Sequence, residues 1–333
     1  MSSDHKSLKL VPCPACGGRV FIPSDTQPLQ TAPCPKCNHA VMMPWMLRQF
    51  ELRSEIASGG MGTVYRAWDT TLGREVAVKL MKQELAGDEA AVDGFAREAR
   101  ACAGLNHTNI ISIYTFDREG ADRYLVMELA DQGSLDDRLE RAGRLPELDV
   151  LDVGIKVAGA LNVAFKHGLL HLDIKPSNIL FGADSEPKVV DFGLAKRTDA
   201  EKEYGTPFFG TPYYISPERI EQKGDTFLAD MYSLGGTLYH CVIGHVPFEA
   251  PSVDDVIAAH IQTPLTPPNQ ILPELSHATS DCLVRAMAKN PADRYPSYDE
   301  FIMALTAARS QLLIRQFAPQ AAESSATTRW WRR

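Results

Sequence analysis

The sequence predicts an α+β protein with a strand-rich first lobe and a helical second lobe, preceded by a small cysteine-rich unit. Four of the seven cysteines lie within the first 44 residues. Short runs of β-forming residues dominate from Phe50 onward, and apolar residues recur at helical spacing beyond Gly133. The expected boundaries are 1–44 for the cysteine-rich unit, 50–312 for the two lobes and 313–333 for a disordered tail.

The first unit has the cysteine spacing of a zinc site. Its prolines rule out a long helix, and residues 19–22 and 41–43 are candidates for short strands. The segment resembles a zinc ribbon, in which two knuckles hold Zn²⁺ tetrahedrally and the metal supplies folding energy that a short chain lacks. A redox Cys-x-x-Cys pair is the alternative interpretation. The predicted zinc ligands form two pairs that are 17 residues apart, Cys13 with Cys16 and Cys34 with Cys37.

The charge distribution argues against a general nucleic-acid binder. The chain carries a net charge of −8; residues 1–49 hold five basic and two acidic side chains, a net +3, which leaves −11 for the rest. Nucleic-acid binders usually present a broad basic surface, so a protein-interaction or spacer module is the favoured interpretation for the zinc unit. Contact with nucleic acid and docking on the acidic body of the same chain are the alternatives.

Nothing in the sequence indicates a membrane protein. No apolar run reaches the roughly 18 residues of a membrane helix, and the first residues lack the apolar segment of a signal peptide. A cytoplasmic location is therefore expected, with no transmembrane segment.

The two lobes are expected to differ in their secondary structure. Residues 76–78 and 124–127 are short β-rich runs of the first lobe. An apolar stripe through Val92, Phe95 and Ala99 places Glu98 on a helix. Two helices of the second lobe are marked by Leu151, Val157, Leu161 and Phe165, and by Met231, Leu234, Leu238 and Val242.

The most informative motif is His-Leu-Asp-Ile-Lys-Pro-Ser-Asn at 171–178, followed by Asp-Phe-Gly at 191–193. Asp173 can accept a hydrogen bond from a substrate hydroxyl, and Lys175 can contact a transferred phosphate. Asn178 and Asp191 offer hard oxygen ligands, which suit Mg²⁺ or Mn²⁺. Because phosphoryl transfer needs an oriented hydroxyl and a held metal ion, this ordered set predicts transfer from ATP.

These motifs resemble those of the eukaryotic-like Ser/Thr protein kinases. Residues 56–64 resemble the Gly-rich loop of that family, and residues 76–79 resemble the strand that carries its phosphate-binding Lys. Residues 210–212 and 216–218 resemble the end of the activation segment. The resemblance spans Phe50 to Leu312 and implies the two-lobed protein kinase fold, with protein Ser/Thr side chains as phosphate acceptors.

The resemblance also implies roles for individual residues. Lys79, paired with Glu98, would bind the α- and β-phosphates of ATP. Glu218 would pair with Arg294. The implied ATP site comprises the Gly-rich loop, the adenine pocket with its gatekeeper and the hinge: Ile56, Ser58, Gly59, Gly60, Gly62, Val64, Ala77, Lys79, Met127, Glu128, Ala130 and Leu180.

Leu172 is the main departure from the family pattern, which usually has Arg before the catalytic Asp. That Arg pairs with a phosphorylated loop residue, and leucine cannot bind phosphate. The sequence therefore predicts activity without phosphorylation of Thr198, Tyr204 or Thr206. Lys175 and Thr211 match the pattern of Ser/Thr rather than Tyr kinases.

Two other functions remain open from the sequence. A pseudokinase scaffold would bind partners without catalysis, although the full catalytic set argues against it. Alternatively, the zinc unit could be a nucleic-acid-binding module with an accessory kinase.

Overall fold

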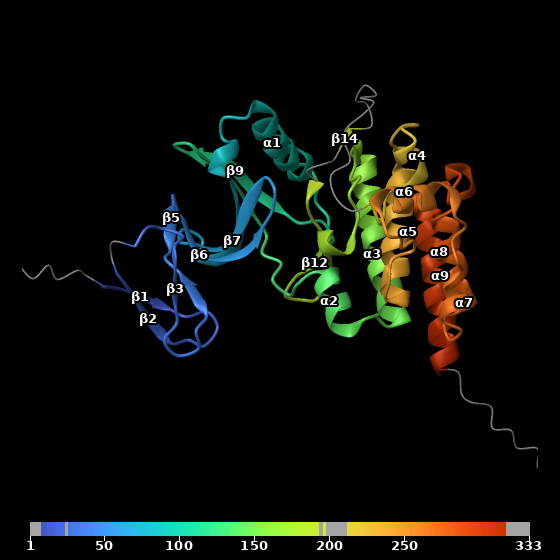
Figure 1. Cartoon of the computed structure of the whole chain (residues 1–333), viewed down its shortest axis with the longest axis horizontal. Coiled ribbons are helices and arrows are strands. Elements are labelled where there is room, and N and C mark those ends of the chain that lie inside the picture. The colour runs from blue at the N-terminus through green and yellow to red at the C-terminus, as the bar shows by residue number, and fades with distance from the viewer. Residues whose placement is uncertain (1–7, 24–25, 193–195, 198–211, 318–333) are drawn as a thin grey trace, which may run out of the picture.

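A curled six-stranded antiparallel sheet forms the first lobe, in the order β5-β6-β7-β8-β10-β9 (Figure 1). The computed structural model describes residues 8–23, 26–192, 196–197 and 212–317. Arg48 in the β5–β6 turn donates to Asp117 of β9 at 2.6 Å, so the two edges of the sheet meet. The strands are β5 (Trp45–Leu47), β6 (Phe50–Ser58), β7 (Gly62–Asp69), β8 (Arg74–Met81), β9 (Ile113–Glu119) and β10 (Asp122–Met127).

Helix α1 (Glu89–Ala103) covers one face of this sheet (Figure 1). Phe95 and Ala99 of its apolar stripe pack against Met81 and Leu125. The other face has its own core, because alternate side chains of a strand point to opposite faces; this core includes Leu52, Val76, Val78, Tyr124 and Val126.

The second lobe is helical. Helix α3 lies at the centre of this lobe and packs against both α5 and α9. Gly154 of α3 allows a close approach, since a Cβ there would lie 2.7 Å from Leu238 of α5. The helices are α2 (Leu135–Ala142), α3 (Glu147–Lys166), α4 (Pro217–Ile220), α5 (Phe227–Ile243), α6 (Val253–Gln262), α7 (Pro268–Ile271), α8 (His277–Ala286) and α9 (Tyr298–Phe317). The predicted two-lobed α+β fold is thus confirmed.

Helix α9 differs from the expected end of the second lobe. It continues past Leu312 to Phe317, into the segment expected to be a disordered tail. Leu313, Arg315 and Gln316 are good helix formers, which favours propagation of an existing helix. The remainder of the predicted tail lies outside the described residues.

The cysteine-rich unit consists of two hairpins that pack on the first lobe. β1 (Leu8–Pro12) pairs with β2 (Arg19–Pro23), and β3 (Thr31–Pro33) pairs with β4 (Ala40–Met42). Met42 belongs to the core of the six-stranded sheet, and Leu29 packs against that core. The chain then enters the sheet directly as β5, so this unit shares apolar contacts with the lobe that follows it.

Candidate active site

The predicted catalytic carboxylate is held within its own loop. Asp173 follows β11 (Leu169–Leu170) and accepts hydrogen bonds at Oδ2 from Lys175 Nζ at 2.7 Å and from Asn178 Nδ2 at 2.9 Å. Asn178, in a 3₁₀ turn, also donates to the Asp173 carbonyl at 2.8 Å. These contacts restrict the carboxylate to one orientation, which acceptance of a hydrogen bond from a substrate hydroxyl requires. They also place the Lys175 ammonium beside it.

The two predicted metal ligands lie on neighbouring backbone segments. β12 (Ile179–Phe181) and β13 (Pro187–Val189) form a hairpin, and the Val190 amide donates to the Asn178 carbonyl at 3.0 Å. Because the Asn178 amide nitrogen is engaged with Asp173, its side-chain oxygen is the atom that can bind a cation. The next residue, Asp191, has a φ of 62° and a side chain that is 48% exposed.

Lys79 faces the same region from the first lobe. Its Nζ lies 3.9 Å from Asp191 Oδ1, and its side chain is only 14% exposed. Val64 is opposite Lys79 in the β7–β8 pair, and Met127 is opposite Ala77 in the β8–β10 pair. Since side chains two residues apart share a face of a strand, these four line one face of the sheet, next to the catalytic loop.

The predicted Gly-rich loop closes the β6–β7 hairpin. The Gly59 amide donates to the Gly62 carbonyl at 2.9 Å, and the Ser58 and Thr63 hydroxyls lie 3.1 Å apart. A Cβ at Gly62 would lie 2.6 Å from the Leu80 carbonyl oxygen, so no larger residue fits there. Ile56 is exposed on β6, and Gly60 has open space around it, which allows a ligand to approach the backbone.

The hinge between the lobes is held by a lysine that the sequence reasoning missed. Glu128 pairs through Oε1 with Lys188 Nζ at 2.7 Å, and Lys188 also donates to the Thr108 carbonyl at 2.9 Å. Ala130 is buried, and Leu180 is partly buried on the second-lobe side. A lysine inside the otherwise apolar strand β13 was a usable signal, because buried ionisable residues are usually paired.

Asp230 holds the backbone of the loop that carries Asp173. Its carboxylate accepts the His171 amide at 2.8 Å and the Leu172 amide at 2.6 Å. Complete burial raises the pKa of Asp230, whereas the two amide hydrogen bonds and the positive charge of Arg219 favour its charged form. Only the tertiary structure reveals this role, because 57 residues separate Asp173 and Asp230 in the sequence.

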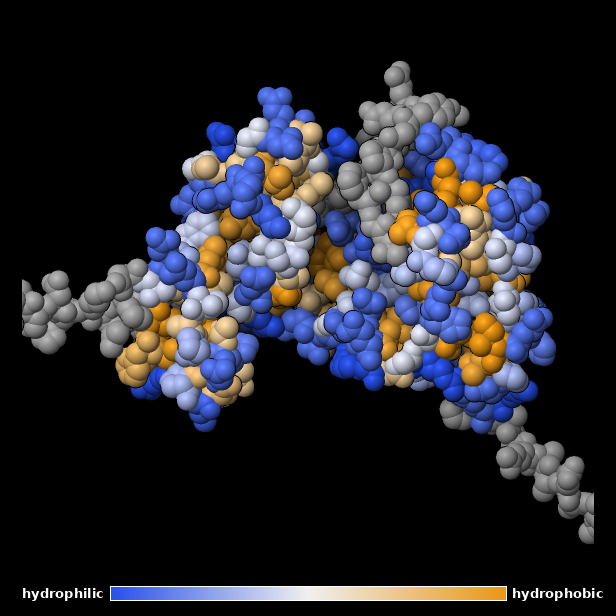
Figure 2. Space-filling model, in the orientation of Figure 1, coloured by the Kyte–Doolittle hydropathy of each residue, from blue (hydrophilic) through white to orange (hydrophobic). Residues whose placement is uncertain are grey.

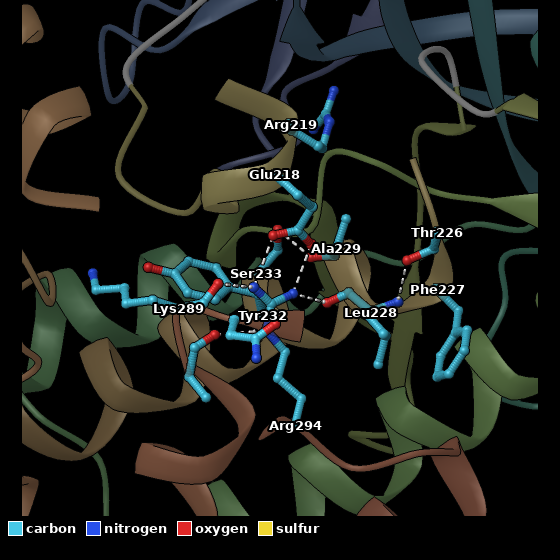
Figure 3. Close-up of polar contacts among 12 residues, drawn as sticks. Glu218, Arg219, Thr226, Phe227, Leu228, Ala229, Tyr232, Ser233, Lys289 and Arg294 are labelled. Atoms are coloured by element: carbon cyan, nitrogen blue, oxygen red, sulfur yellow. Dashed lines mark hydrogen bonds and ion pairs between the residues drawn. The ribbon is translucent and has the colours of Figure 1, made fainter. Parts of the chain in front are cut away.

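The predicted pair between Glu218 and Arg294 is present and buried (Figure 3). Two parallel hydrogen bonds of 2.6 and 2.8 Å join the guanidinium to the carboxylate. Arg294 also donates to the carbonyls of Leu228 and Ala288, both at 2.8 Å. The pair therefore anchors α4, at the end of the activation segment, to the second lobe.

Some predicted contacts fall outside the described part of the structure. The backbone of Glu98 lies on α1 as expected, but its side chain is not described. Thr198, Tyr204, Thr206 and Thr211 lie wholly outside the described residues. The Lys79–Glu98 pair and the match of Thr211 to the Ser/Thr kinase pattern stay predictions.

The four predicted zinc ligands converge on one point. All four sulfurs lie within 4.8 Å of one another. Cys13 Sγ is 3.6 Å from Cys37 Sγ, and Cys16 Sγ is 3.7 Å from Cys34 Sγ. Tetrahedral coordination with bonds of about 2.3 Å would set the sulfurs about 3.8 Å apart, so the geometry fits Zn²⁺.

The backbone of the two cysteine hairpins repeats one turn. Gly17 donates to the Cys13 carbonyl and Asn38 to the Cys34 carbonyl, both at 2.8 Å, with φ of 68° and 60° at the donors. Hydrogen bonding to the Lys36 amide lowers the pKa of Cys34 to about 7. The His39 amide lowers the pKa of Cys37, but the Cys16 thiol and burial outweigh it and raise this pKa to about 12. The Cys37 thiol therefore resists deprotonation unless a cation binds it.

Comparison with known proteins agrees with this geometry. The protein kinase domain family matches residues 50–304. A probable serine/threonine-protein kinase of Clostridium perfringens, CPE1738, is 36% identical over 255 residues, which are 76% of this chain and 37% of the relative. The serine/threonine-protein kinases PknA and PknL of Mycobacterium tuberculosis are 38% and 34% identical over 79% and 84% of this chain, and over 62% and 71% of their own lengths.

The match with the clostridial relative covers less than two fifths of that protein's length. The match with the protein kinase family begins at residue 50, after the cysteine-rich unit. With most of its length matched and its two-lobed fold in place, the chain belongs to the protein kinase family.

Proposed function

We propose that this chain is an ATP-dependent protein serine/threonine kinase. The observation that carries the proposal is the catalytic loop, in which Asp173 is held by Lys175 and Asn178 while Lys79 approaches Asp191 across the cleft. Carboxylate, amide and lysine groups thus lie on adjoining backbone segments, and these are the groups that phosphoryl transfer needs. The proposal of Ser/Thr acceptors rests on Lys175 and on the names of the relatives.

In this mechanism Asp173 accepts the hydrogen bond of the substrate hydroxyl and orients its oxygen toward the γ-phosphate. Lys175 balances the charge that develops on the transferred group, and Lys79 holds the α- and β-phosphates. Asn178 and Asp191 would hold Mg²⁺ or Mn²⁺, which neutralises phosphate charge when bound. Val64, Ala77, Met127 and Leu180 provide the apolar surface for the adenine ring.

Replacement of Asp173 tests this assignment. Asp173→Asn keeps the size of the side chain but removes its ability to accept a proton, so phosphorylation of a Ser/Thr peptide is expected to fall by about a hundredfold or more. ATP affinity, measured by calorimetry, should stay within about twofold, because Asp173 does not contact the nucleotide in this mechanism. Peptide phosphorylation at the wild-type rate would contradict the assignment and favour a scaffold without catalysis.

We further propose that the cysteine-rich unit binds one Zn²⁺ through Cys13, Cys16, Cys34 and Cys37. The intersulfur distances support this metal. Zinc binding needs these cysteines reduced, and this requirement, together with use of ATP, favours the cytoplasm. Within the described residues, no helix has the length and apolar character needed to cross a membrane.

A protein partner for this unit stays a proposal. Leu10 and Phe21 lie opposite each other on β1 and β2 and are 45% and 63% exposed. Figure 2 shows hydrophobic surface on the unit, at the left of the molecule. Exposed apolar surface on so small a unit supports contact with another protein.

Loss of the metal should unfold the cysteine-rich unit. Cys13→Ser with Cys34→Ser is expected to lower bound zinc from about one per chain to below about 0.1, measured by atomic emission. Proteolysis should then cut within residues 8–43 while the lobes persist at a lower Tm, because Met42 leaves their core.

The matched control is Cys282→Ser, which changes a buried thiol far from the cluster and should keep the zinc. Full zinc in the double variant, or a folded cysteine-rich unit without any metal, would contradict the zinc proposal.

A further inference from the structure

The residue before the predicted catalytic Asp adopts an unusual backbone conformation. Leu172 has a φ of 65°, in the left-handed region that branched apolar residues rarely occupy. Its side chain is buried in a cluster with Leu170 and Ala229, and Phe227 packs against that cluster. This apolar environment would not solvate a cation at position 172, and surrounding contacts must hold the strained backbone in place.

Two charged side chains form hydrogen bonds with the backbone of Leu172, one at its amide and one at its carbonyl oxygen. Asp230 accepts its amide at 2.6 Å, and the Arg219 guanidinium donates to its carbonyl oxygen. That carbonyl belongs to the peptide group whose nitrogen is the Asp173 amide. The orientation of this peptide plane sets the direction in which the Asp173 side chain leaves the loop.

We infer that Arg219 is a positioning residue for Asp173, which fixes the catalytic loop from the end of the activation segment. The inference rests on the proposed function, in which Asp173 orients the substrate hydroxyl. Arg219 acts through the Leu172 carbonyl and has no contact with substrate or nucleotide in this role.

The position of Arg219 is itself well defined. It lies on α4 beside Glu218, which the buried Arg294 holds by two hydrogen bonds. Arg219 Nε also lies 3.3 Å from Asp225 Oδ1, so a carboxylate orients the guanidinium. In Figure 3 the Arg219 side chain points away from the Glu218–Arg294 pair. A rigid connection therefore runs from Arg294 through α4 to the loop that carries Asp173.

This connection offers a physical reason why position 172 can hold leucine, where the family usually has arginine. An arginine at that position would need a phosphate to link the loop to the activation segment. Arg219 approaches from the activation segment and binds a backbone carbonyl, which is always present. The link from segment to loop therefore needs no phosphate, consistent with the activity expected without loop phosphorylation.

The test is Arg219→Met, which keeps much of the side-chain length and removes every donor. We expect kcat on a Ser/Thr peptide to fall about tenfold or more, with KM for ATP and ATP affinity within about twofold of wild type. Deuterium uptake at residues 170–175, measured by mass spectrometry, should rise. The matched control is Arg309→Met, which breaks a half-exposed ion pair with Asp152 far from the loop and should change neither kcat nor loop uptake.

Unchanged kcat in Arg219→Met would overturn the inference, and so would a loss in which ATP affinity falls as much as kcat. Should this variant fail to fold, Arg219→Leu carries the same two criteria with a shorter side chain that also has no donor. Asp173→Asn separates the two proposals. If that variant is active, the assignment of Asp173 is wrong; if it is inactive while Arg219→Met and Arg219→Leu are fully active, only the role of Arg219 is wrong.

Discussion

Asp191→Asn is expected to lower kcat by about a thousandfold, roughly 4 kcal/mol of transition-state stabilisation, while the fold stays intact. Asp191 is partly exposed in the cleft, with Lys79 Nζ 3.9 Å from its carboxylate. An amide keeps the shape of this side chain but removes the negative charge that holds a divalent cation against the phosphates. The measurement is initial velocity on a Ser/Thr peptide over a range of Mg²⁺ concentrations, with circular dichroism to confirm folding.

Asp184→Asn is the control for this prediction. Asp184 lies in the turn between β12 and β13, where its carboxylate accepts the Glu186 amide at 3.1 Å. It should leave kcat within about twofold, because this turn has no place in the proposed mechanism. Turnover of Asp191→Asn within tenfold of wild type at saturating Mg²⁺ would exclude Asp191 as the principal metal ligand.

Arg294→Met should destabilise the protein by about 3–5 kcal/mol, because it leaves the buried carboxylate of Glu218 without its partner. Arg294 has no exposed side-chain surface and that of Glu218 is 7% exposed. For a domain of this size, a loss of that magnitude lowers Tm by about 10 °C. Thermal unfolding followed by calorimetry would measure the change.

Two further variants make the test of this pair specific. Arg144→Met breaks an exposed pair with Glu274 and should cost less than about 1 kcal/mol. Adding Glu218→Leu to Arg294→Met should recover part of the stability, because no unpaired charge then remains buried. A Tm of Arg294→Met within about 2 °C of wild type would show that water or another group compensates the carboxylate.

Much of the candidate site was predictable because its residues lie close together in the sequence. Asp173, Lys175 and Asn178 fall within six residues, so a single loop brings their side chains into contact. The short β-rich runs and the helical spacing of apolar residues likewise predicted a strand-rich first lobe and a helical second lobe.

The contacts made across long distances in the sequence were not predictable in the same way. Only the fold brings Arg219 against Leu172. Lys188 stands out in an otherwise apolar strand, but only the fold shows that Glu128 is its partner. Met42 looked like part of a separate unit, yet it lies in the core of the six-stranded sheet. Such contacts depend on the packing of whole elements, which local patterns do not encode.

The sequence by itself determined the chemical groups of this protein: the carboxylates and amide of the catalytic loop, the lysine of the first lobe and the two pairs of thiols. The tertiary structure decided how these groups are held. Asp230 and Arg219 hold the strained backbone at Leu172, and Met42 and Leu29 join the cysteine hairpins to the core of the first lobe. The physical reason is that reactivity belongs to individual side chains, whereas orientation comes from the packing and hydrogen bonding of segments far apart in the chain.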